Sequence, residues 1–298
     1  MGGGGDVVGA LAVARFCESL GTPFVLGGVA WERIVVDPRP GPRPLTETRG
    51  GRRLGDHALL ADGETATIDG VAFSEALMAR HLRIDTVLVD VTAGSAGVAS
   101  GLTTTCRELD CDLVVLADVG GDVLATGSEP GLASPLCDAV VLAGGLELAG
   151  QGGPRPLLAV IGAGCDGELS STEVLERIAS AARAGAWLGA SGLTPIVTDE
   201  LEAAARASYT EASMQVVRCA RGELGEVPIR GGRRTVHLGP VGAITFFLDP
   251  LVGLEQTAPL TAAVAGTSDI EGARQALEAL GVRTELDYER ERAAEPRA

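Results

Sequence analysis

The sequence predicts an α/β fold: a Rossmann-like, doubly wound, mostly parallel sheet with helices on both faces and a C-terminal helix and strand addition. Two observations lead to this prediction. Apolar runs without alternation, such as 113–117 and 157–161, are typical of strands buried on both faces of a parallel sheet. Each run stops at a glycine-rich loop, and a helical pattern follows. Because this order recurs along the chain, we expect parallel strands joined by crossover helices.

The remaining elements follow from periodicity and end signals. Gly21 ends the first helical pattern, Ser134-Pro135 begins another, and Ser170 or Ser171 caps a third. We expect strands at 23–29, 86–91, 113–117, 157–161, 235–238 and 243–248, an edge hairpin within 50–70, and helices at 73–82, from the loop at 94–97 to about 109, from 135, from 171, and at 201–208, 211–221 and 270–280.

The length of 298 residues suits one large α/β unit or two average domains. We expect an α/β core with glycine-rich loops over 1–192 and an α/β extension over 193–286 that packs on the same core. The charged composition of 287–298 indicates a disordered tail.

The charge balance restricts the partners. With 24 basic and 40 acidic residues, the net charge is −16, which opposes attraction to nucleic acid or to an anionic membrane. All basic residues are arginines, so lysine-dependent chemistry such as a P-loop lysine or a Schiff base is excluded.

Six cysteines without C-x-x-C spacing, and no long apolar segment, indicate a reduced cytoplasmic protein that does not span a membrane. Homo-oligomerisation is left open.

The strand at 113–117 leads into the first candidate site. Asp118 and Asp122 bracket Gly120 and Gly121, whose backbone allows close approach of a ligand. In open α/β sheets, ligands bind outside the carboxyl ends of the strands, where this loop is expected. Asp118 and Asp122 are therefore candidate catalytic residues or metal ligands. The alternative is that both carboxylates only cap a tight turn.

The second candidate is the glycine-rich loop that opens the first helix. Gly3, Gly4, Gly5 and Asp6 would present free N–H groups and the positive end of the helix dipole to an anion. A strand should precede such a loop, and the sequence before it has no room for one. Either that strand is missing or the loop is an unanchored, flexible terminus.

Further site residues are expected on loops of the same kind. Arg33 and Arg43 lie in a proline-rich segment and suit carboxylate or phosphate recognition, unless that segment is only a solvated surface loop. Asp166 is a third candidate metal ligand, and Glu129 a candidate partner that orients a hydroxyl group. Additional substrate or phosphate contacts are expected from Glu32, Thr92, Gly94, Ser95, Ser134, Gly162 and Gly164.

Three motifs in order resemble one prokaryotic family. They are Gly2 to Ala10, the segment from Val29 through Arg43, and Asp118 to Asp122 with Glu129 and 134–138. The chain resembles, over nearly its whole length, the archaeal and actinobacterial family catalogued as domain of unknown function 1152. The resemblance implies a fold and no particular chemistry.

The leading hypothesis is an enzyme that acts on a small phosphorylated metabolite, such as a nucleotide, nucleoside or sugar phosphate, with Mg²⁺ as candidate cofactor. A cluster of carboxylates repels itself unless a cation compensates, which favours Mg²⁺. One alternative is an enzyme for an amine, guanidine or amino-acid-like substrate without metal. Another is a non-catalytic, metabolite-binding regulatory module. A dinucleotide site is disfavoured because Gly2 to Gly9 does not keep the G-x-G-x-x-G frame.

Overall fold

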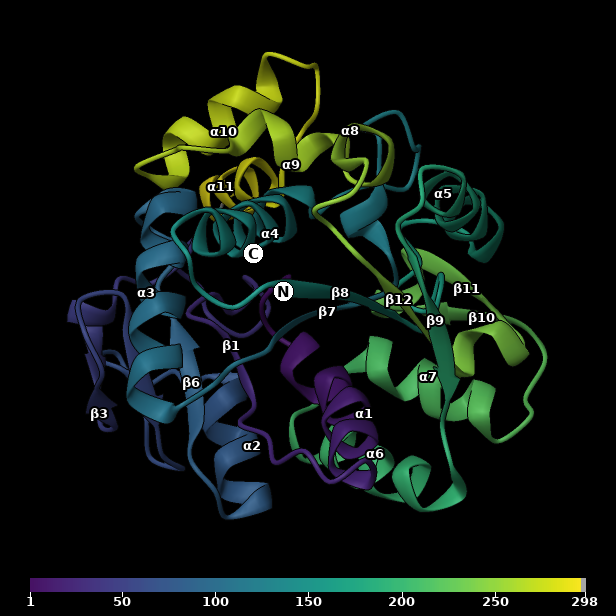
Figure 1. Cartoon of the computed structure of the whole chain (residues 1–298), viewed down its shortest axis with the longest axis horizontal. Coiled ribbons are helices and arrows are strands. Elements are labelled where there is room, and N and C mark those ends of the chain that lie inside the picture. The colour runs from purple at the N-terminus through teal and green to yellow at the C-terminus, as the bar shows by residue number, and fades with distance from the viewer. Residues whose placement is uncertain (296–298) are drawn as a thin grey trace.

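Two four-stranded sheets carry the fold in the computed structural model of this chain, which describes residues 1–295 (Figure 1). The first has the order β1 (Gly27–Val29), β6 (Thr86–Val89), β4 (Ala58–Ala61) and β3 (Arg52–Arg53). Strands β1 and β6 are parallel, whereas β4 is antiparallel to both β6 and β3. The fold is therefore a mixed α/β fold.

The second sheet has the order β7 (Val114–Val119), β8 (Pro156–Ile161), β12 (Ile244–Leu248) and β9 (Trp187–Gly192). Strands β7 and β8 are parallel, and β12 runs antiparallel between β8 and β9. The C-terminal third of the chain thus supplies a strand to the sheet that its N-terminal part begins.

Strands β7 and β8 are apolar on both faces because helices cover both faces. Leu158 and Val160 belong to one hydrophobic core and Ala159 and Ile161 to another. Helices α1 (Asp6–Ser19), α6 (Pro195–Ala207) and α7 (Glu211–Ala220) form the core on one face. Helices α3 (Gly94–Leu109), α4 (Pro135–Gly150) and α5 (Ser171–Arg183) form the core on the other (Figure 1). An unalternating apolar strand is what burial on both faces requires.

The other elements extend these layers. They are α2 (Ser74–Leu82), the pair β2 (Thr48–Arg49) and β5 (Ala66–Thr67), the hairpin β10 (Gly225–Ile229) and β11 (Arg234–Leu238), α8 (Leu254–Thr257), α9 (Pro259–Val264), α10 (Ile270–Glu278), α11 (Glu285–Ala294), and the short 3-10 helices Leu45–Glu47, Asp122–Leu124, Arg230–Gly232 and Pro240–Ala243.

Most of the expected elements are present. The Ser170 hydroxyl accepts from the Glu173 N–H, and Glu173 bonds back to Ser170, a capping box that confirms the predicted start of α5. Helix α6 begins earlier than expected, because Thr194 caps it and Pro195 occupies its first position. Strands β9 and β10 were not expected, since glycines and charged residues interrupt their apolar pattern.

The single, mostly parallel sheet stays a prediction. Within residues 1–295, the strands form separate sheets, and β1–β6 and β7–β8 are their parallel pairs. Among those residues, no helix combines the length and apolar character needed to cross a bilayer.

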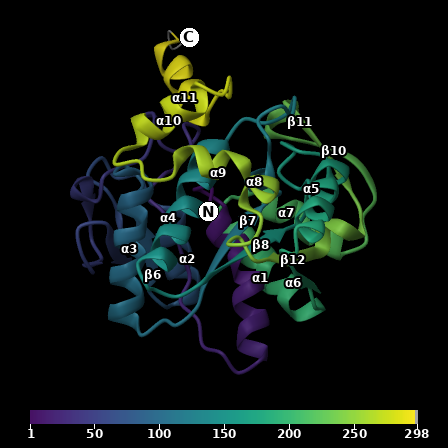
Figure 2. The ribbon, with the colours of Figure 1, turned by 45° about the horizontal axis from the view of Figure 1, so that its top comes forward.

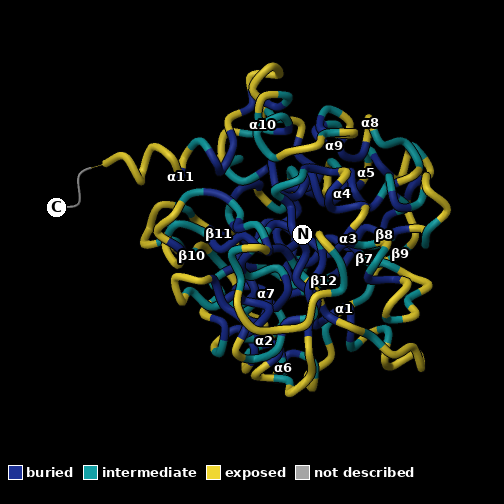
Figure 3. The backbone as a smooth tube through the Cα atoms, turned by 90° about the vertical axis from the view of Figure 1, so that its left-hand side faces the viewer, coloured by how far each residue is buried: buried dark blue, intermediate teal, exposed yellow. Residues whose placement is uncertain are grey.

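The expectation of a disordered tail is wrong for residues 287–294. They belong to α11, which begins with a capping box between Thr284 and Asp287 and projects from the body (Figure 2). Glu289 is buried and accepts hydrogen bonds from Trp31 Nε1 (3.1 Å) and Gly41 N (2.8 Å). The charged sequence concealed this contact, because Glu285, Leu286 and Glu289 are the buried residues of α11 and its outer part is exposed (Figure 3). Residues 296–298 of the expected tail lie outside the described residues.

Arg43, expected to bind substrate, is instead part of a buried ion pair. Its Nε and Nη2 atoms donate to the two carboxylate oxygens of Asp37, each at 2.6 Å. Both side chains are almost completely buried, with relative exposures of 2% and 1%. The guanidinium group therefore fixes the proline-rich segment after β1.

Breaking this pair should destabilise the protein. Asp37→Asn removes the hydrogen-bonded counter-charge of the buried Arg43 guanidinium and leaves only Glu47 and Asp69, at 3.5 and 3.6 Å. We therefore expect a loss of about 3 kcal/mol in the free energy of unfolding. The measurement is urea denaturation followed by circular dichroism. Arg39→Met is the matched control, because Arg39 pairs with Glu47 at the surface and should contribute less than about 1 kcal/mol. Equal losses in both variants would contradict the assignment.

Candidate functional site

A pocket of about 120 Å³ lies at the carboxyl end of β7, beside the amino end of α1. Its lining combines acidic side chains with the first glycines, two arginines and the turn that precedes α7. Its lining residues include Gly2, Gly3, Gly4, Gly5, Asp6, Glu32, Arg33, Asp118, Asp122, Ser134, Asp138, Asp166, Glu168, Tyr209 and Arg230.

Six carboxylates of the pocket form two groups. Asp6, Asp118 and Asp138 offer oxygens that lie within 4.8 Å of one another. They come from the first residue of α1, the carboxyl end of β7 and the first turn of α4. We call this set the first triad. Segments more than a hundred residues apart in sequence therefore meet at one point.

The second triad consists of Asp122, Asp166 and Glu168, whose oxygens also lie within 4.8 Å of one another. Asp122 begins the short helix after β7, and the other two lie in the loop after β8. Glu168 Oε2 accepts from the N–H groups of Ala133 and Ser134, at 2.7 and 2.8 Å. Arg234 also pairs with Glu168 at 2.9 Å, so this carboxylate is held firmly.

Burial and mutual repulsion raise the pKa values of Asp118, Asp122, Asp138 and Asp166. Burial, followed by the nearby charge of Asp6, raises the pKa of Asp118 to about 7. Burial is also the main reason why the pKa values of Asp122, Asp138 and Asp166 lie well above their ordinary range, and neighbouring carboxylates add to it. A cation in the pocket would oppose both effects.

Two carboxylate oxygens of the cluster are buried without a hydrogen-bond partner. They are Oδ1 of Asp138 in the first triad and Oδ1 of Asp166 in the second. Both residues are more than nine-tenths buried, with relative exposures of 2% and 6%. Because a buried polar atom is rarely left without a partner, each oxygen is a free position for a ligand.

Glycines permit the close approach of these segments. Gly3 has φ +76°, and a Cβ atom there would lie 2.6 Å from the Trp31 carbonyl oxygen. Gly120 has φ +123°, and a Cβ atom there would lie 2.2 Å from Asp166 Oδ1. A larger residue at either position would push the loop away from its neighbour.

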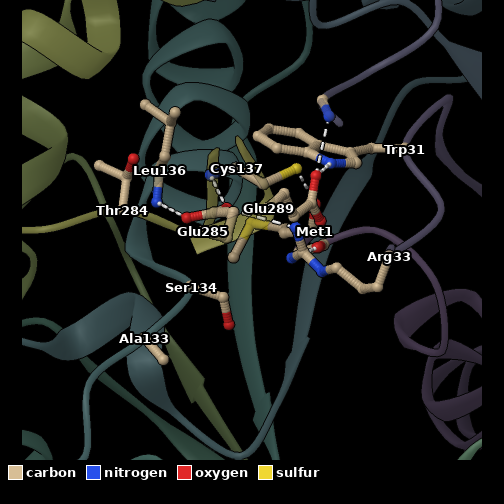
Figure 4. Close-up of polar contacts among 12 residues, drawn as sticks. Met1, Trp31, Arg33, Ala133, Ser134, Leu136, Cys137, Thr284, Glu285 and Glu289 are labelled. Atoms are coloured by element: carbon tan, nitrogen blue, oxygen red, sulfur yellow. Dashed lines mark hydrogen bonds and ion pairs between the residues drawn. The ribbon is translucent and has the colours of Figure 1, made fainter. Parts of the chain in front are cut away.

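The amino end of α4 is fixed by the C-terminal helix (Figure 4). The two oxygens of Glu285 accept from Leu136 N (3.0 Å) and Cys137 N (2.8 Å). Arg33 lies 3.5 Å from Glu285, stacks over the Trp31 ring and donates to the Gly2 carbonyl oxygen. Burial lowers the pKa of Arg33, but the surrounding negative charges, Glu285 first among them, together outweigh burial and raise the pKa above its ordinary value. This network ties the first glycines to the helix that carries Asp138.

The structure brings together about half of the residues expected from the sequence. The expected residues that line the pocket are Gly3, Gly4, Gly5, Asp6, Glu32, Arg33, Asp118, Asp122, Ser134 and Asp166. The expected residues outside its lining are Arg43, Thr92, Gly94, Ser95, Gly120, Gly121, Glu129, Gly162 and Gly164.

The residues outside the lining have local roles. Glu129 accepts from the N–H groups of Thr126 and Gly127 and closes its own turn. The Ser95 hydroxyl donates to Val264 O, so the C-terminal segment covers that strand end. Gly164 N donates to Gly120 O and Gly162 N to Ile244 O, contacts that position the loops on either side of Asp166.

The sequence interpretation did not select Asp138, Glu168 or Arg230. Asp138 stands one turn inside a predicted helix, and an acidic residue near a helix start is usually a favourable dipole contact. Glu168 follows Asp166 by two residues, and this spacing was a usable signal. Ser134 precedes α4 as predicted, but its hydroxyl donates to Glu168, lies 3.4 Å from Asp122 Oδ2 and does not cap the helix.

The fold and site define an α/β protein with a small, strongly acidic pocket at the carboxyl end of a parallel strand pair. The family model described as "Protein of unknown function (DUF1152)" matches residues 1–293, and the chain belongs to this family. Comparisons with curated proteins and with solved structures give no significant match.

The raised pKa values predict how stability depends on pH. Asp118 takes up its proton near pH 7 in the folded protein and near pH 4 when unfolded, so the protein loses stability as the pH rises through this range. Without divalent ions, the free energy of unfolding should fall between pH 5 and 7. Asp118→Asn should reduce this fall by roughly 1 kcal/mol per pH unit.

Urea titrations in EDTA at pH 5, 6 and 7 measure the effect. Glu176→Gln, on the exposed face of α5, serves as the control and should keep the parent slope. An unchanged slope in Asp118→Asn would show that this carboxyl group does not titrate in that range.

Proposed function

We propose that this protein is an enzyme that acts on a small phosphorylated metabolite, such as a nucleotide, nucleoside or sugar phosphate, with the assistance of Mg²⁺. The two carboxylate triads in one pocket are the observation that carries this proposal. Carboxylate oxygens are the protein ligands that Mg²⁺ prefers, and the unpartnered oxygens of Asp138 and Asp166 provide one open ligand position in each triad.

The residues fit a pair of cations. Asp118 and Asp138 would hold one cation, and Asp122 and Asp166 the other. Glu168 already accepts hydrogen bonds from two backbone N–H groups. Its role would therefore be to fix the loop and, through its charge, to orient Asp122 and Asp166. When bound, such a pair supplies charge neutralisation for both the attacking and the leaving oxygen of a phosphoryl group.

The anionic end of the substrate would meet the glycine loop and the arginines. The N–H groups of Gly2 and Gly4 already donate to Asp6 and Trp31. Gly3 and Gly5 also line the pocket, so their N–H groups are the ones available to an anion. Arg230 also lines the pocket, and its nearest acidic partner, Glu211, is 3.7 Å away. It is therefore the guanidinium best placed to move to a phosphate oxygen.

The volume of the pocket limits what enters it. About 120 Å³ is less than the roughly 300 Å³ at the lower end of small-molecule sites, so it suits a phosphate group and its counter-ions. The rest of the metabolite would lie at the mouth, near Tyr209, whose side chain is 88% exposed. When no cation is bound to Asp118, its pKa of about 7 suits it to proton transfer at neutral pH.

The finer fold class belongs to the same proposal. A pocket at the carboxyl ends of parallel strands is the location that a doubly wound, Rossmann-like sheet would provide. The six cysteines without C-x-x-C spacing support a cytoplasmic protein. The net charge of −16 supports a small-molecule partner and opposes nucleic acid or membrane partners.

Mg²⁺ should stabilise the folded protein. At a concentration of 100 Kd, binding contributes about 2.7 kcal/mol and raises Tm by roughly 5 °C. Asp122→Asn and Asp166→Asn should raise Tm in EDTA, because they remove repulsion, and should abolish the rise with Mg²⁺. Differential scanning fluorimetry in EDTA and in Mg²⁺ measures both changes in Tm.

Glu129→Gln is the matched control, since Glu129 is acidic, lies near the site and does not line the pocket. It should keep the full Mg²⁺ response. A Mg²⁺ response that survives in both aspartate variants would place the cation elsewhere.

Turnover should require the same residues. In a panel of nucleotides and sugar phosphates, we expect Mg²⁺-dependent release or transfer of phosphate that Asp118→Asn and Asp122→Asn each reduce by at least about 100-fold. Circular dichroism checks that both variants fold. Full activity in both variants would remove the proposed mechanism.

A second candidate is favoured by the excess of carboxylates over arginines in the pocket. Six carboxylates can also bind an organic cation, so a metal-free enzyme for an amine, guanidine or amino-acid-like substrate fits the same charge pattern. Arg33, and not the buried Arg43, would contact the substrate carboxylate. Activity that persists in EDTA would favour this candidate, and tight binding without turnover would favour a regulatory module.

A further inference from the structure

The lining of the acidic pocket reverses the usual distribution of side chains. Among the described residues that line it, the exposed ones are Val35 (62%), Val36 (54%) and Tyr209 (88%). The carboxylates of both triads are buried or half-buried in the same pocket. In most proteins charged side chains are exposed and apolar ones are buried. The pocket therefore suits a ligand with a charged end that enters it and an apolar body that stays at its mouth.

The turn that carries the two valines is fixed. The N–H groups of Val36 and Asp37 both donate to the Arg33 carbonyl oxygen, at 2.7 and 3.0 Å. Asp37 is held in turn by its buried ion pair with Arg43. The valine side chains are thus presented at the mouth by a well-anchored turn, and a loose surface loop does not explain their exposure.

The third exposed residue, Tyr209, has a backbone conformation that favours glycine. It follows the end of α6 with a φ of +56°, in the left-handed region where a helix most often places glycine. Thr210 N donates back to the Ala205 carbonyl oxygen (3.1 Å) and closes the turn. A Cβ atom on Gly5 would lie 2.1 Å from Thr210 Oγ1, so this turn packs directly on the glycine loop. An exposed aromatic ring is therefore kept beside the glycine loop at a position where the backbone disfavours it.

We propose that the metabolite is a nucleoside phosphate, whose base stacks on the Tyr209 ring and contacts Val35 and Val36. This inference rests on the proposed function, because that function assigns the phosphate end to the glycine loop and the carboxylate-bound cations. A nucleobase is flat and stacks on aromatic side chains, and it lies at the opposite end of the nucleoside from the phosphate.

The mouth is less suited to the other phosphorylated metabolites. A sugar phosphate without a base would place its hydroxyl groups against Val35 and Val36, whose side chains neither donate nor accept hydrogen bonds. An alkyl phosphate would make the apolar contacts but would lack the planar ring that stacks on Tyr209. The base is the group that uses all three exposed residues.

Isothermal titration calorimetry of the full chain in Mg²⁺ tests the proposal with three probes. They are the phosphonate analogues of adenosine 5′-phosphate and ribose 5-phosphate, together with hexylphosphonate. The first two differ only in the base, and the carbon–phosphorus bond of all three prevents release of phosphate during the titration. The adenosine probe should bind at least about 10-fold more tightly than either of the others, as expected for one base stacked on an aromatic side chain.

Variants of the tyrosine assign this difference to its ring. Tyr209→Gly should weaken binding of the adenosine probe by about 10-fold or more and leave the Kd of the ribose probe unchanged. Tyr209→Phe keeps the ring and should keep both Kd values. Because glycine suits a φ of +56°, Tyr209→Gly should fold without a loss in Tm, which separates the role of the ring in binding from a role in folding.

The valines are tested in the same way. The double variant Val35→Ser and Val36→Ser should weaken binding of the adenosine probe by about 3-fold and leave that of the ribose probe unchanged. Ile196→Ser is the matched control, because Ile196 is 73% exposed and does not line the pocket. It should change neither Kd.

Equal Kd values for the adenosine and ribose probes, or a ratio that Tyr209→Gly leaves unchanged, would overturn this inference while the phosphate function stands. Hexylphosphonate that binds as tightly as the adenosine probe would also overturn it, because the mouth would then bind any apolar body. If none of the three probes bound in Mg²⁺, the proposed function itself would fail, and the nucleoside assignment with it.

Discussion

The repulsion among six buried or half-buried carboxylates is the constraint that the rest of the structure must satisfy. The surrounding chain offsets part of it with donors: Val123 N reaches Asp118, and Ala133 N, Ser134 N and Arg234 reach Glu168. The oxygens of Asp138 and Asp166 that remain without partners show that this compensation is incomplete. Retaining such a cluster is costly for the apo protein, and a bound cation would relieve that cost.

Long-range contacts hold the repelling groups in place. Glu285 bonds the first N–H groups of α4, and Arg33 links Glu285 to the glycine loop. Glu289, one turn later on α11, accepts from Trp31. The C-terminal helix therefore clamps the N-terminal segment against the helix that carries Asp138. The site depends on the whole chain, in agreement with the family match over residues 1–293.

The acidic pocket shares Asp6 with a second cavity of about 630 Å³, which is lined by β1 and β7. The amino group of Met1 lies 3.2 Å from Asp6 Oδ2 and contributes positive charge there.

The sequence by itself determined the local elements and the residues at strand ends. Unalternating apolar runs identified β7 and β8, the Ser170 capping box identified α5, and Asp118 with Asp122 identified the central loop. These signals are local, because periodicity and capping depend on neighbouring residues. Tertiary structure decided which strand ends meet: it brought Asp138 and Glu168 into the site, left Thr92 and Glu129 outside it, paired Arg43 with Asp37 and folded 287–294 into a helix. Those outcomes rest on contacts between segments distant in sequence. The sequence alone does not show whether a charged or polar residue makes such a contact and becomes buried, or makes none and stays in solvent.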